Sequence, residues 1–336
     1  MSYPSIVLAI CTYNNHEILA RTLSCIAQQQ VVPKIKWSVL VIDNHCTDHT
    51  SAIVQKHIAS GDIPTLRLVQ ESQQGLSYAR RRAVRESEAD WIAFVDDDCF
   101  LPPDWVQQAV VFCAEHPKAG AIGGKVDLLW EVPPQEFLRG YEHDFAQQDY
   151  GDSPLCLSFT GLQCLNGAGL LLQRRLLLAS GWLEEMILAG RNGKMLSSGS
   201  DTEIVLRLRN AGNELWYNPK MKLQHYIPKR RMSVDYLCRL HRGFGQSHPI
   251  LLMLAERRSP TLLTKLYLCL RSLMFLARRS LKIANPLCWY RGISCRTSLQ
   301  YVLGYMEGAF TFLFQKKPFN NAQPHLRSEG KISSPF

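Results

Sequence analysis

Residues 90–98 read Asp-Trp-Ile-Ala-Phe-Val-Asp-Asp-Asp, an apolar run that ends in three carboxylates. Three earlier apolar runs precede it, at residues 5–10, 37–42 and 65–69, and stretches with helical spacing separate the four runs. Continuous apolar strands that alternate with helices are typical of a parallel sheet covered on both faces. The sequence therefore predicts an α/β fold whose sheet contains these four strands.

Polar residues follow each predicted strand, and ligands of such sheets bind beyond the carboxyl ends of the strands. Asp43 follows the second strand, and residues 96–98 follow the fourth. Adjacent carboxylates repel one another unless a cation or strong donors lie among them. Mg²⁺ characteristically combines one or two carboxylates with substrate phosphates. We therefore favour a metal site at residues 96–98 over the alternative, an acidic cluster that complements the dipole of a helix near Pro102.

The composition limits the class of protein. The chain has 336 residues, 46% hydrophobic and 20% charged, which excludes a disordered chain, a collagen and a coiled coil. Its net charge of +9 is unevenly spread, because residues 1–220 hold 19 basic and 25 acidic side chains, whereas residues 221–336 hold 19 and 4. This asymmetry argues against nucleic-acid binding and favours contact between the C-terminal third and an anionic partner.

Sequence features also predict the compartment. The eleven cysteines form no Cys-x-x-Cys pair, and the first residues lack the charged and apolar regions of a signal peptide. No run of about 20 uninterrupted apolar residues marks a clear membrane span. We expect a cytoplasmic protein, with a peripheral position on the inner face of the plasma membrane as the alternative.

Seven short motifs occur in order along residues 5–245, and in them the chain resembles the family 2 glycosyltransferases of the GT-A fold. They are Ile10-Cys11-Thr12-Tyr13-Asn14, Val41-Ile42-Asp43-Asn44, Gly75-Leu76-Ser77-Tyr78-Ala79-Arg80, Phe94-Val95-Asp96-Asp97-Asp98, Asn166-Gly167-Ala168-Gly169, Gly199-Ser200-Asp201-Thr202-Glu203, and Tyr217-Asn218-Pro219 followed by His225. Residues 201–245 look most like bacterial enzymes that build exported or cell-surface polysaccharide.

The resemblance implies a Rossmann-like, mostly parallel sheet with helices on both faces. Residues 1–245 would form the GT-A domain, with a nucleotide-sugar-binding half (1–126) and an acceptor and catalytic half (127–245). Residues 246–336 would form a helical, basic C-terminal extension.

For the donor, the resemblance implies a nucleotide diphosphosugar, most simply a UDP-sugar, bound with Mn²⁺ or Mg²⁺. Asp98, with Asp96 and with His225 nearby, would hold the metal, and Asp97 or Asp96 would meet the ribose. Three further residues, Thr12, Tyr13 and Asp43, would line the base pocket. Arg80 would flank the base and phosphates, although a solvated helix face shared with other arginines is the alternative.

For catalysis, the resemblance implies Asp201 as the general base, which removes a proton from an acceptor hydroxyl. Glu203 is a second choice, but two residues further along a helix it points elsewhere. The family usually has Glu at the position that Ser200 occupies, so no second carboxylate is expected there. The chain also lacks the Gln-x-x-Arg-Trp motif of the processive synthases, which favours transfer of single sugars.

The basic C-terminal third contains two helical patterns. Between residues 264 and 282, polar positions recur every seven residues, which predicts a narrow basic stripe beside a wide apolar face. Residues 298–314 form a second apolar run, in which Gly304 and Gly308 indicate close helix packing. Either the helices pack on the catalytic domain or a second protomer, or they lie in the interface of an anionic membrane, which we favour slightly.

The leading hypothesis is a metal-dependent, inverting hexosyltransferase that moves one sugar from a nucleotide diphosphosugar to a glycan or lipid-linked acceptor in polysaccharide biosynthesis. The alternatives are a nucleotidyltransferase on a similar sheet and a non-catalytic polysaccharide-binding or scaffold protein. A nucleotidyltransferase would need a glycine-rich, basic phosphate loop after the first strand, and residues 11–15 offer none.

Overall fold

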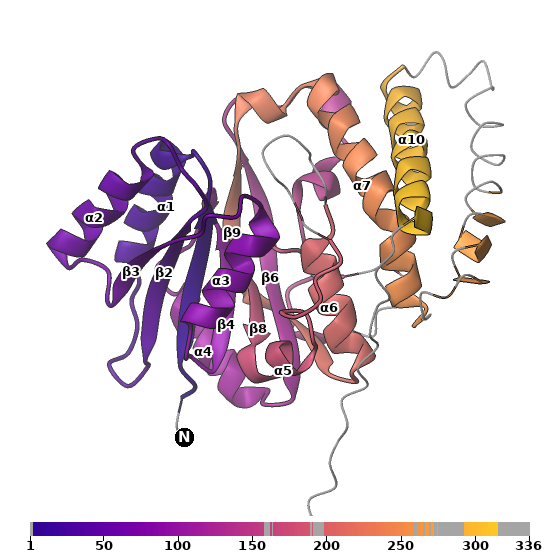
Figure 1. Ribbon diagram of the computed structural model, residues 1–336. Coiled ribbons are helices and arrows are strands. Elements are labelled where there is room, and N and C mark those ends of the chain that lie inside the picture. Colours follow the sequence, from indigo (N-terminus) through magenta and orange to yellow (C-terminus); the bar gives the residue numbers. More distant parts are fainter. Residues whose placement is uncertain are drawn as a thin grey trace, which may run out of the picture.

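The computed structural model describes residues 3–157, 162, 164–188, 190, 198–257 and 292–314, together with nine residues between 261 and 274. The strands are β1 (Ile6–Thr12), β2 (Trp37–Asp43), β3 (Leu66–Gln70), β4 (Trp91–Asp96), β5 (Cys99–Phe100), β6 (Ala119–Trp130), β7 (Leu155–Cys156), β8 (Leu170–Gln173) and β9 (Glu214–Ile227). The α-helices are α1 (His16–Ala27), α2 (Thr50–Ser60), α3 (Leu76–Glu86), α4 (Trp105–Glu115), α5 (Arg174–Ala179), α6 (Ser200–Asn210), α7 (Val234–Ala255) and α10 (Ile293–Phe314). The α/β alternation predicted for the first 116 residues is confirmed (Figure 1).

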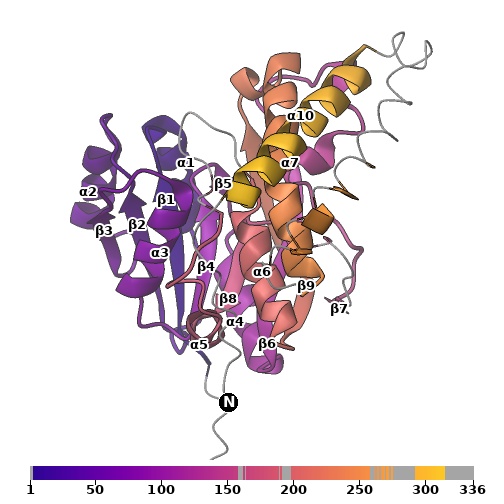
Figure 2. The ribbon, with the colours of Figure 1, turned by 45° about the vertical axis from the view of Figure 1, so that its right-hand side comes forward.

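The strands form one mixed sheet in the order β3-β2-β1-β4-β8-β6-β9-β5, with β7 paired to β9. Figure 2 shows the N-terminal strands at one side of this sheet and β6 and β9 at the other. β1 pairs in parallel with both β2 and β4, so Thr12 lies level with Asp43, and Cys11 with Asp96. The register therefore brings the polar residues that follow these strands to one edge of the sheet.

Helices cover both faces of the sheet, as a parallel sheet of apolar strands requires. Alternate residues of β1 point to opposite faces: Ile6, Leu8 and Ile10 pack with the helices α1, α2 and α4, whereas Val7 and Ala9 pack with α3 and α6. All five side chains are buried. Two apolar layers thus fix the sheet and, with it, the edge where the strands end.

Two stretches in the second half of the chain differ from what their local sequence predicts. The apolar spacing of residues 170–180 predicts a helix, but these residues form strand β8 and the short helix α5. A short apolar run suits a helix or a strand equally well, and here pairing with β4 and β6 selects the strand. Residues 216–219 predict a short strand that ends in a turn, but β9 pairs with β6 as far as Ile227. Residues 190–200, rich in Gly, Ser, Asn and Lys, predict a mobile loop, of which residues 191–197 lie outside the described residues.

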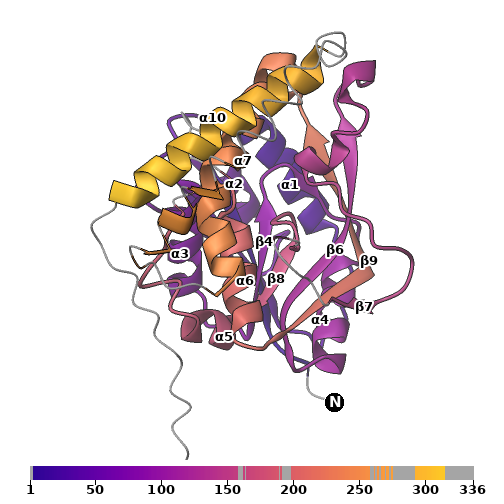
Figure 3. The same ribbon diagram turned by 90° about the vertical axis from the view of Figure 1, so that its right-hand side faces the viewer.

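At the C-terminal end, α10 crosses the outer side of α7 (Figure 3). A Cβ atom added at Gly304 or Gly308 would lie 2.0 Å from a backbone oxygen of α7, which confirms the close packing predicted from their spacing.

The boundary predicted at residue 245 falls within α7, so a division there would cut a helix. The predicted stripe at 264–282 lies mostly outside the described residues. Within the described segments, no helix is long and apolar enough to span a bilayer.

Candidate active site

A cavity of about 1270 Å³ opens at the carboxyl ends of β1 and β4. One side, which we call the N-terminal wall, consists of residues 11–15 and 96–98 together with Asn44. The opposite side, the C-terminal wall, consists of Gly167, residues 198–202, His225, residues 230–231, α7 and Tyr301 of α10. Eight of the nine predicted site residues line this cavity, namely Thr12, Tyr13, Arg80, Asp96, Asp97, Asp98, Asp201 and His225.

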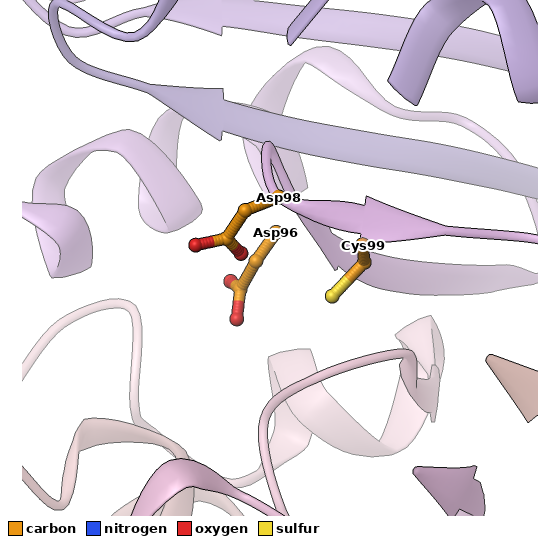
Figure 4. Close-up of side chains that lie close together, drawn as sticks. All are labelled: Asp96, Asp98 and Cys99. Carbon is orange, nitrogen blue, oxygen red and sulfur yellow. The ribbon is translucent and has the colours of Figure 1, made fainter. Parts of the chain in front are cut away.

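The turn at residues 96–98, which we call the acidic turn, contributes two carboxylates that could hold a cation. Asp96 ends β4, and Asp98 precedes β5. Their side chains lie next to each other, with Cys99 beside them, and ligand atoms of all three lie within 4.8 Å of one another (Figure 4). The pKa of the buried Cys99 thiol is raised well above its usual range by burial, so a carboxylate pair is the main donor set. Carboxylate oxygens suit Mn²⁺ and Mg²⁺, so these residues fit the predicted metal.

Asp97 faces a different way from its two neighbours. Its carboxylate accepts hydrogen bonds from the Thr12 hydroxyl (2.7 Å) and the Asn15 amide (2.8 Å), and Thr22 donates to its backbone oxygen (2.8 Å). Burial, and then the charge of Asp98, raise the pKa of Asp97 to about 7. Asp97 therefore ties the acidic turn to the end of β1 and to α1.

Asp98 is buried against groups from β9 and the turn that follows it. Its Oδ2 lies 2.9 Å from Nη1 of Arg231, and its Oδ1 lies 3.3 Å from Nε2 of His225. The His225 Nδ1 lies 2.8 Å from the Phe145 carbonyl oxygen. Burial works to lower the pKa of His225, but the charge of Asp98 and the contact with it outweigh burial and raise that pKa. Asp98 is thus a buried carboxylate surrounded by cationic or proton-donating groups.

Arg80 joins the two walls. Its side chain is only 3% exposed, so it does not lie on a solvated helix face. Nη2 lies 3.6 Å from Oδ1 of Asp96, and Nη1 donates to the Ser200 hydroxyl at 3.3 Å. The guanidinium also lies over the Phe94 ring, 5.1 Å from its centroid. A buried guanidinium therefore connects the end of β4 with the start of α6.

Asp201 lies in the first turn of α6, beside this arginine. A Cβ atom added at Gly167 would lie 2.5 Å from Oδ2 of Asp201 and 3.0 Å from Nη2 of Arg80. The carboxylate of Asp201 and the guanidinium of Arg80 therefore meet over a residue without a side chain. The structure thus brings Asp201 into the same cavity as the acidic turn.

Glu203, the second choice for the base, is bound by neighbouring protein groups. Its carboxylate is fully buried, forms an ion pair with Arg207 at 3.0 Å and accepts hydrogen bonds from the backbone nitrogens of Ile187 and Leu188. Burial raises its pKa despite these partners. Glu203 holds residues 187–188 against α6 and does not line the cavity.

Asp43 lies at the same edge of the sheet, but it does not line the cavity. It is 5% exposed, and its Oδ1 accepts a hydrogen bond from the backbone nitrogen of Cys46 at 2.7 Å. Its neighbour Asn44 lines the cavity and accepts from the backbone nitrogen of Gly75 at 2.7 Å. Tyr13, exposed and also lining the cavity, completes this end of the N-terminal wall.

The sequence alone indicates no role for Arg231 or for the α7 and α10 side chains of the C-terminal wall. The available signal for Arg231 was the basic run Lys229–Arg231 directly after a strand. Nothing in the local sequence connects Tyr301 of α10 with the acidic turn, because only the packing of α10 on α7 brings it there.

The family model of glycosyl transferase family 2 matches residues 7–157, which run from β1 to β7. Residues 7–157 are therefore similar to glycosyl transferase family 2. The protein is a glycosyltransferase, an enzyme that transfers a sugar from a nucleotide-sugar donor. This favours the transferase hypothesis over the nucleotidyltransferase and the non-catalytic protein.

Two curated relatives cover most of the glycosyltransferase. A succinoglycan biosynthesis protein, ExoM of Rhizobium meliloti, is 25% identical over 246 residues, which are 73% of this chain and 74% of ExoM. A glucosyl-dolichyl phosphate glucuronosyltransferase of Haloferax volcanii is 25% identical over 259 residues, 72% of this chain and 74% of the relative.

Solved structures confirm the predicted GT-A fold of the glycosyltransferase. A mannosyltransferase of Pyrobaculum calidifontis, solved in complex with GDP-Man and Mn²⁺, superposes with a TM-score of 0.55 at 18% identity. The superposition covers 94% of this chain and 88% of the mannosyltransferase. At this identity the likeness concerns the fold alone.

Proposed function

We propose that the glycosyltransferase moves one hexose from a nucleotide diphosphosugar to a glycan or lipid-linked acceptor, with inversion at the anomeric carbon. One observation carries the proposal: the carboxylate pair Asp96 and Asp98 and the separate carboxylate Asp201 line one cavity. An inverting displacement needs this division, because the leaving diphosphate and the attacking hydroxyl occupy opposite sides of the sugar.

In the proposed reaction, Asp201 accepts the proton of the acceptor hydroxyl. The acceptor oxygen forms a bond to the anomeric carbon, while the bond from that carbon to the diphosphate breaks and its electron pair leaves with the diphosphate. The products are the extended acceptor, a nucleoside diphosphate and a proton on Asp201. Gly167 leaves the Asp201 carboxylate open to the cavity, as this step requires.

Residues of the N-terminal wall would hold the donor. Asp96 and Asp98 would hold Mn²⁺ or Mg²⁺, which neutralises charge that develops on the departing diphosphate. Thr12, Tyr13 and Asp43 would line the nucleobase pocket, since Thr12 and Asp43 are level in the register of β1 and β2 and Tyr13 directly follows Thr12. We propose a UDP-sugar as the donor, with Arg80 positioned beside the phosphates.

The relatives support a role in the biosynthesis of polysaccharide or of a glycoconjugate. ExoM is a succinoglycan biosynthesis protein, and the Haloferax relative acts on a glucosyl-dolichyl phosphate, according to their names. A lipid-linked acceptor would suit the basic residues Arg230, Arg231 and Arg239 on the C-terminal wall.

Asp201→Asn tests the base directly. We expect transfer to fall by roughly 1,000-fold, within the range for loss of a general base. Calorimetric binding of UDP with Mn²⁺ should stay unchanged, because the donor-binding residues remain. Asp104→Asn, an exposed aspartate before α4 and away from the cavity, is the matched control. Full transfer activity of the Asp201 variant would refute the assignment.

We also propose that α10 lies on an anionic membrane surface at the inner face of the plasma membrane. Leu299, Leu303, Met306 and Phe310 follow helical spacing and are 37 to 65% exposed, and Arg296 on the same helix is exposed. Such an apolar stripe with basic neighbours suits an anionic lipid interface. The net charge of the C-terminal third is complementary to such lipids.

Vesicle flotation tests this surface. Phe310→Gln should reduce binding to vesicles that contain phosphatidylglycerol, whereas Ile58→Gln, which changes an exposed apolar residue of α2, should not. Equal flotation of wild type and the Phe310 variant would remove α10 from the membrane contact.

A further inference from the structure

Both oxygens of the Asp98 carboxylate are approached by nitrogen atoms from the β9 side of the cavity. Oδ2 lies 2.9 Å from Nη1 of Arg231, and Oδ1 lies 3.3 Å from Nε2 of His225. The Asp98 side chain is 5% exposed and the Arg231 side chain 19%. A carboxylate this deeply buried needs a counter-charge, and Arg231 supplies one.

The two partners of Asp98 differ in their freedom to leave it. His225 is anchored at its other ring nitrogen, since Nδ1 lies 2.8 Å from the Phe145 carbonyl oxygen. His225 itself lies in β9, where it pairs with Cys99 of β5. Arg231 instead reaches Asp98 through a long side chain from the turn Lys229–Arg231, and that side chain also lines the open cavity. The arginine can turn away from Asp98 more easily than the histidine can.

A divalent cation on Asp96 and Asp98 would share the Asp98 carboxylate with this guanidinium. Two positive groups in contact with one carboxylate repel each other, so the cation and Arg231 disfavour each other at Asp98. The guanidinium has a natural alternative partner when the donor arrives, because arginine binds phosphate oxygens in a bidentate manner.

We propose that Arg231 takes the place of the metal ion on Asp98 while the enzyme is unloaded, and that it moves to the diphosphate when metal and nucleotide sugar bind. The inference rests on the proposed function, in which Asp96 and Asp98 hold the cation. It gives Arg231 two successive partners, a protein carboxylate and then a ligand phosphate.

Arg231→Gln should shift two affinities in opposite directions. Mn²⁺ alone, titrated by electron paramagnetic resonance, should bind about tenfold more tightly, because its competitor at Asp98 is gone. UDP, titrated by calorimetry at saturating Mn²⁺, should bind about tenfold more weakly, because one charged contact to the diphosphate is lost. A residue with a purely structural role would weaken both affinities together.

Arg231→Lys and Lys229→Gln complete the test. Arg231→Lys keeps the charge, so Mn²⁺ affinity should stay near the wild-type value while UDP affinity falls, since lysine lacks the planar fork. Lys229→Gln removes an exposed charge from the same turn and should change neither affinity. Thermal unfolding of each variant verifies that it is folded.

The outcomes separate the inference from the proposed function. If wild type binds Mn²⁺ and UDP but Arg231→Gln leaves Mn²⁺ affinity unchanged or weaker, the exchange at Asp98 is wrong and the proposed function stands. Unchanged UDP affinity in that variant would refute the movement to the diphosphate. If wild type binds neither probe, the cation site of the proposed function is wrong, and the exchange is wrong with it.

Discussion

The two walls of the cavity are built in different ways. Short side chains at the ends of β1 and β4 form most of the N-terminal wall, and neighbouring protein groups hold them, as Thr12 and Asn15 hold Asp97. Side chains from distant segments form the C-terminal wall, including the long side chain of Arg231 and the ring of Tyr301 on α10. The N-terminal wall depends on the register of the sheet, whereas the C-terminal wall depends on helix packing.

This difference leads us to expect that donor binding and transfer to the acceptor depend on different walls. The proposed metal and diphosphate need fixed ligands, which the backbone register of a buried sheet can supply. A wall of helices can change without disturbing the sheet. We therefore expect changes in the two walls to have separable effects on donor binding and on transfer.

After the loss of the Asp201 carboxylate, the largest expected effect comes from breaking the connection between the walls. Arg80→Met keeps most of the volume but removes the guanidinium that lies between Asp96 and Ser200. Transfer should fall by roughly 100-fold, the cost of a small misplacement of reacting groups, as measured by nucleoside diphosphate release. Arg82→Met, which alters a half-buried arginine on the same helix that pairs with Glu86 outside the cavity, should leave the rate unchanged. Equal rates in the two variants would show that the walls act without this connection.

A smaller effect should follow from separating α10 from α7. Gly308→Val places a side chain where only 2.0 Å separates an added Cβ from the Gln246 carbonyl oxygen. Thermal unfolding should show a loss of about 2 kcal/mol, in the range for overpacking. Transfer should fall, because Tyr301 moves with α10, while UDP binding at the N-terminal wall persists. Thr311→Val, at an exposed site on α10, is the control, and a parallel loss of UDP affinity would contradict the separation of the walls.

An effect of similar size on stability concerns the support of the N-terminal wall. Asp48 accepts hydrogen bonds from the backbone nitrogens of His16 (3.1 Å) and Thr50 (3.0 Å), at the starts of α1 and α2. Partial burial works to raise the pKa of Asp48, but the hydrogen bonds from Thr50 and His16 outweigh it and lower that pKa to about 2. Asp48→Asn should therefore reduce the free energy of unfolding at pH 7 by about 2 kcal/mol.

The pH dependence distinguishes this effect from a general loss of packing. The folded chain holds Asp48 more acidic than the unfolded chain does, so its contribution is present above the ordinary pKa of 3.8 and is lost as the pH falls through about 2. The difference between wild type and Asp48→Asn in urea unfolding should shrink over that interval. A difference that stays constant with pH would contradict the assigned cause.

The N-terminal half could be predicted from sequence because its signals are local. The apolar runs and the polar residues after them are adjacent in the chain, so β1, β2, β4 and the acidic turn were recognisable. Strand β8 and the length of β9 were not, because an apolar run becomes a strand there only through pairing with other strands. In the second half, the motifs were recognisable only through the resemblance to the family. The close packing of α10 was predictable from the spacing of Gly304 and Gly308.

The site was predictable as a set of residues but not as a set of contacts. Eight of the nine predicted residues line one cavity, yet the sequence could not tell that Asp97 turns toward Thr12 or that Asp43 turns toward Cys46. Side-chain direction in a turn depends on the backbone of several elements at once. The contact between Asp98 and Arg231 depends on β5 and β9 pairing, which joins segments far apart in the sequence.

Gly167 has a consequence for how the enzyme could be studied. Its α-carbon faces both the Asp201 carboxylate and the Arg80 guanidinium, and a Cβ atom there would already collide with Asp201 at 2.5 Å. Any side chain at this position would therefore occupy space beside Asp201 and Arg80 without removing a charged group. Gly167→Ala, which adds a single methyl group, should therefore inactivate the enzyme while every carboxylate of the site stays in the chain.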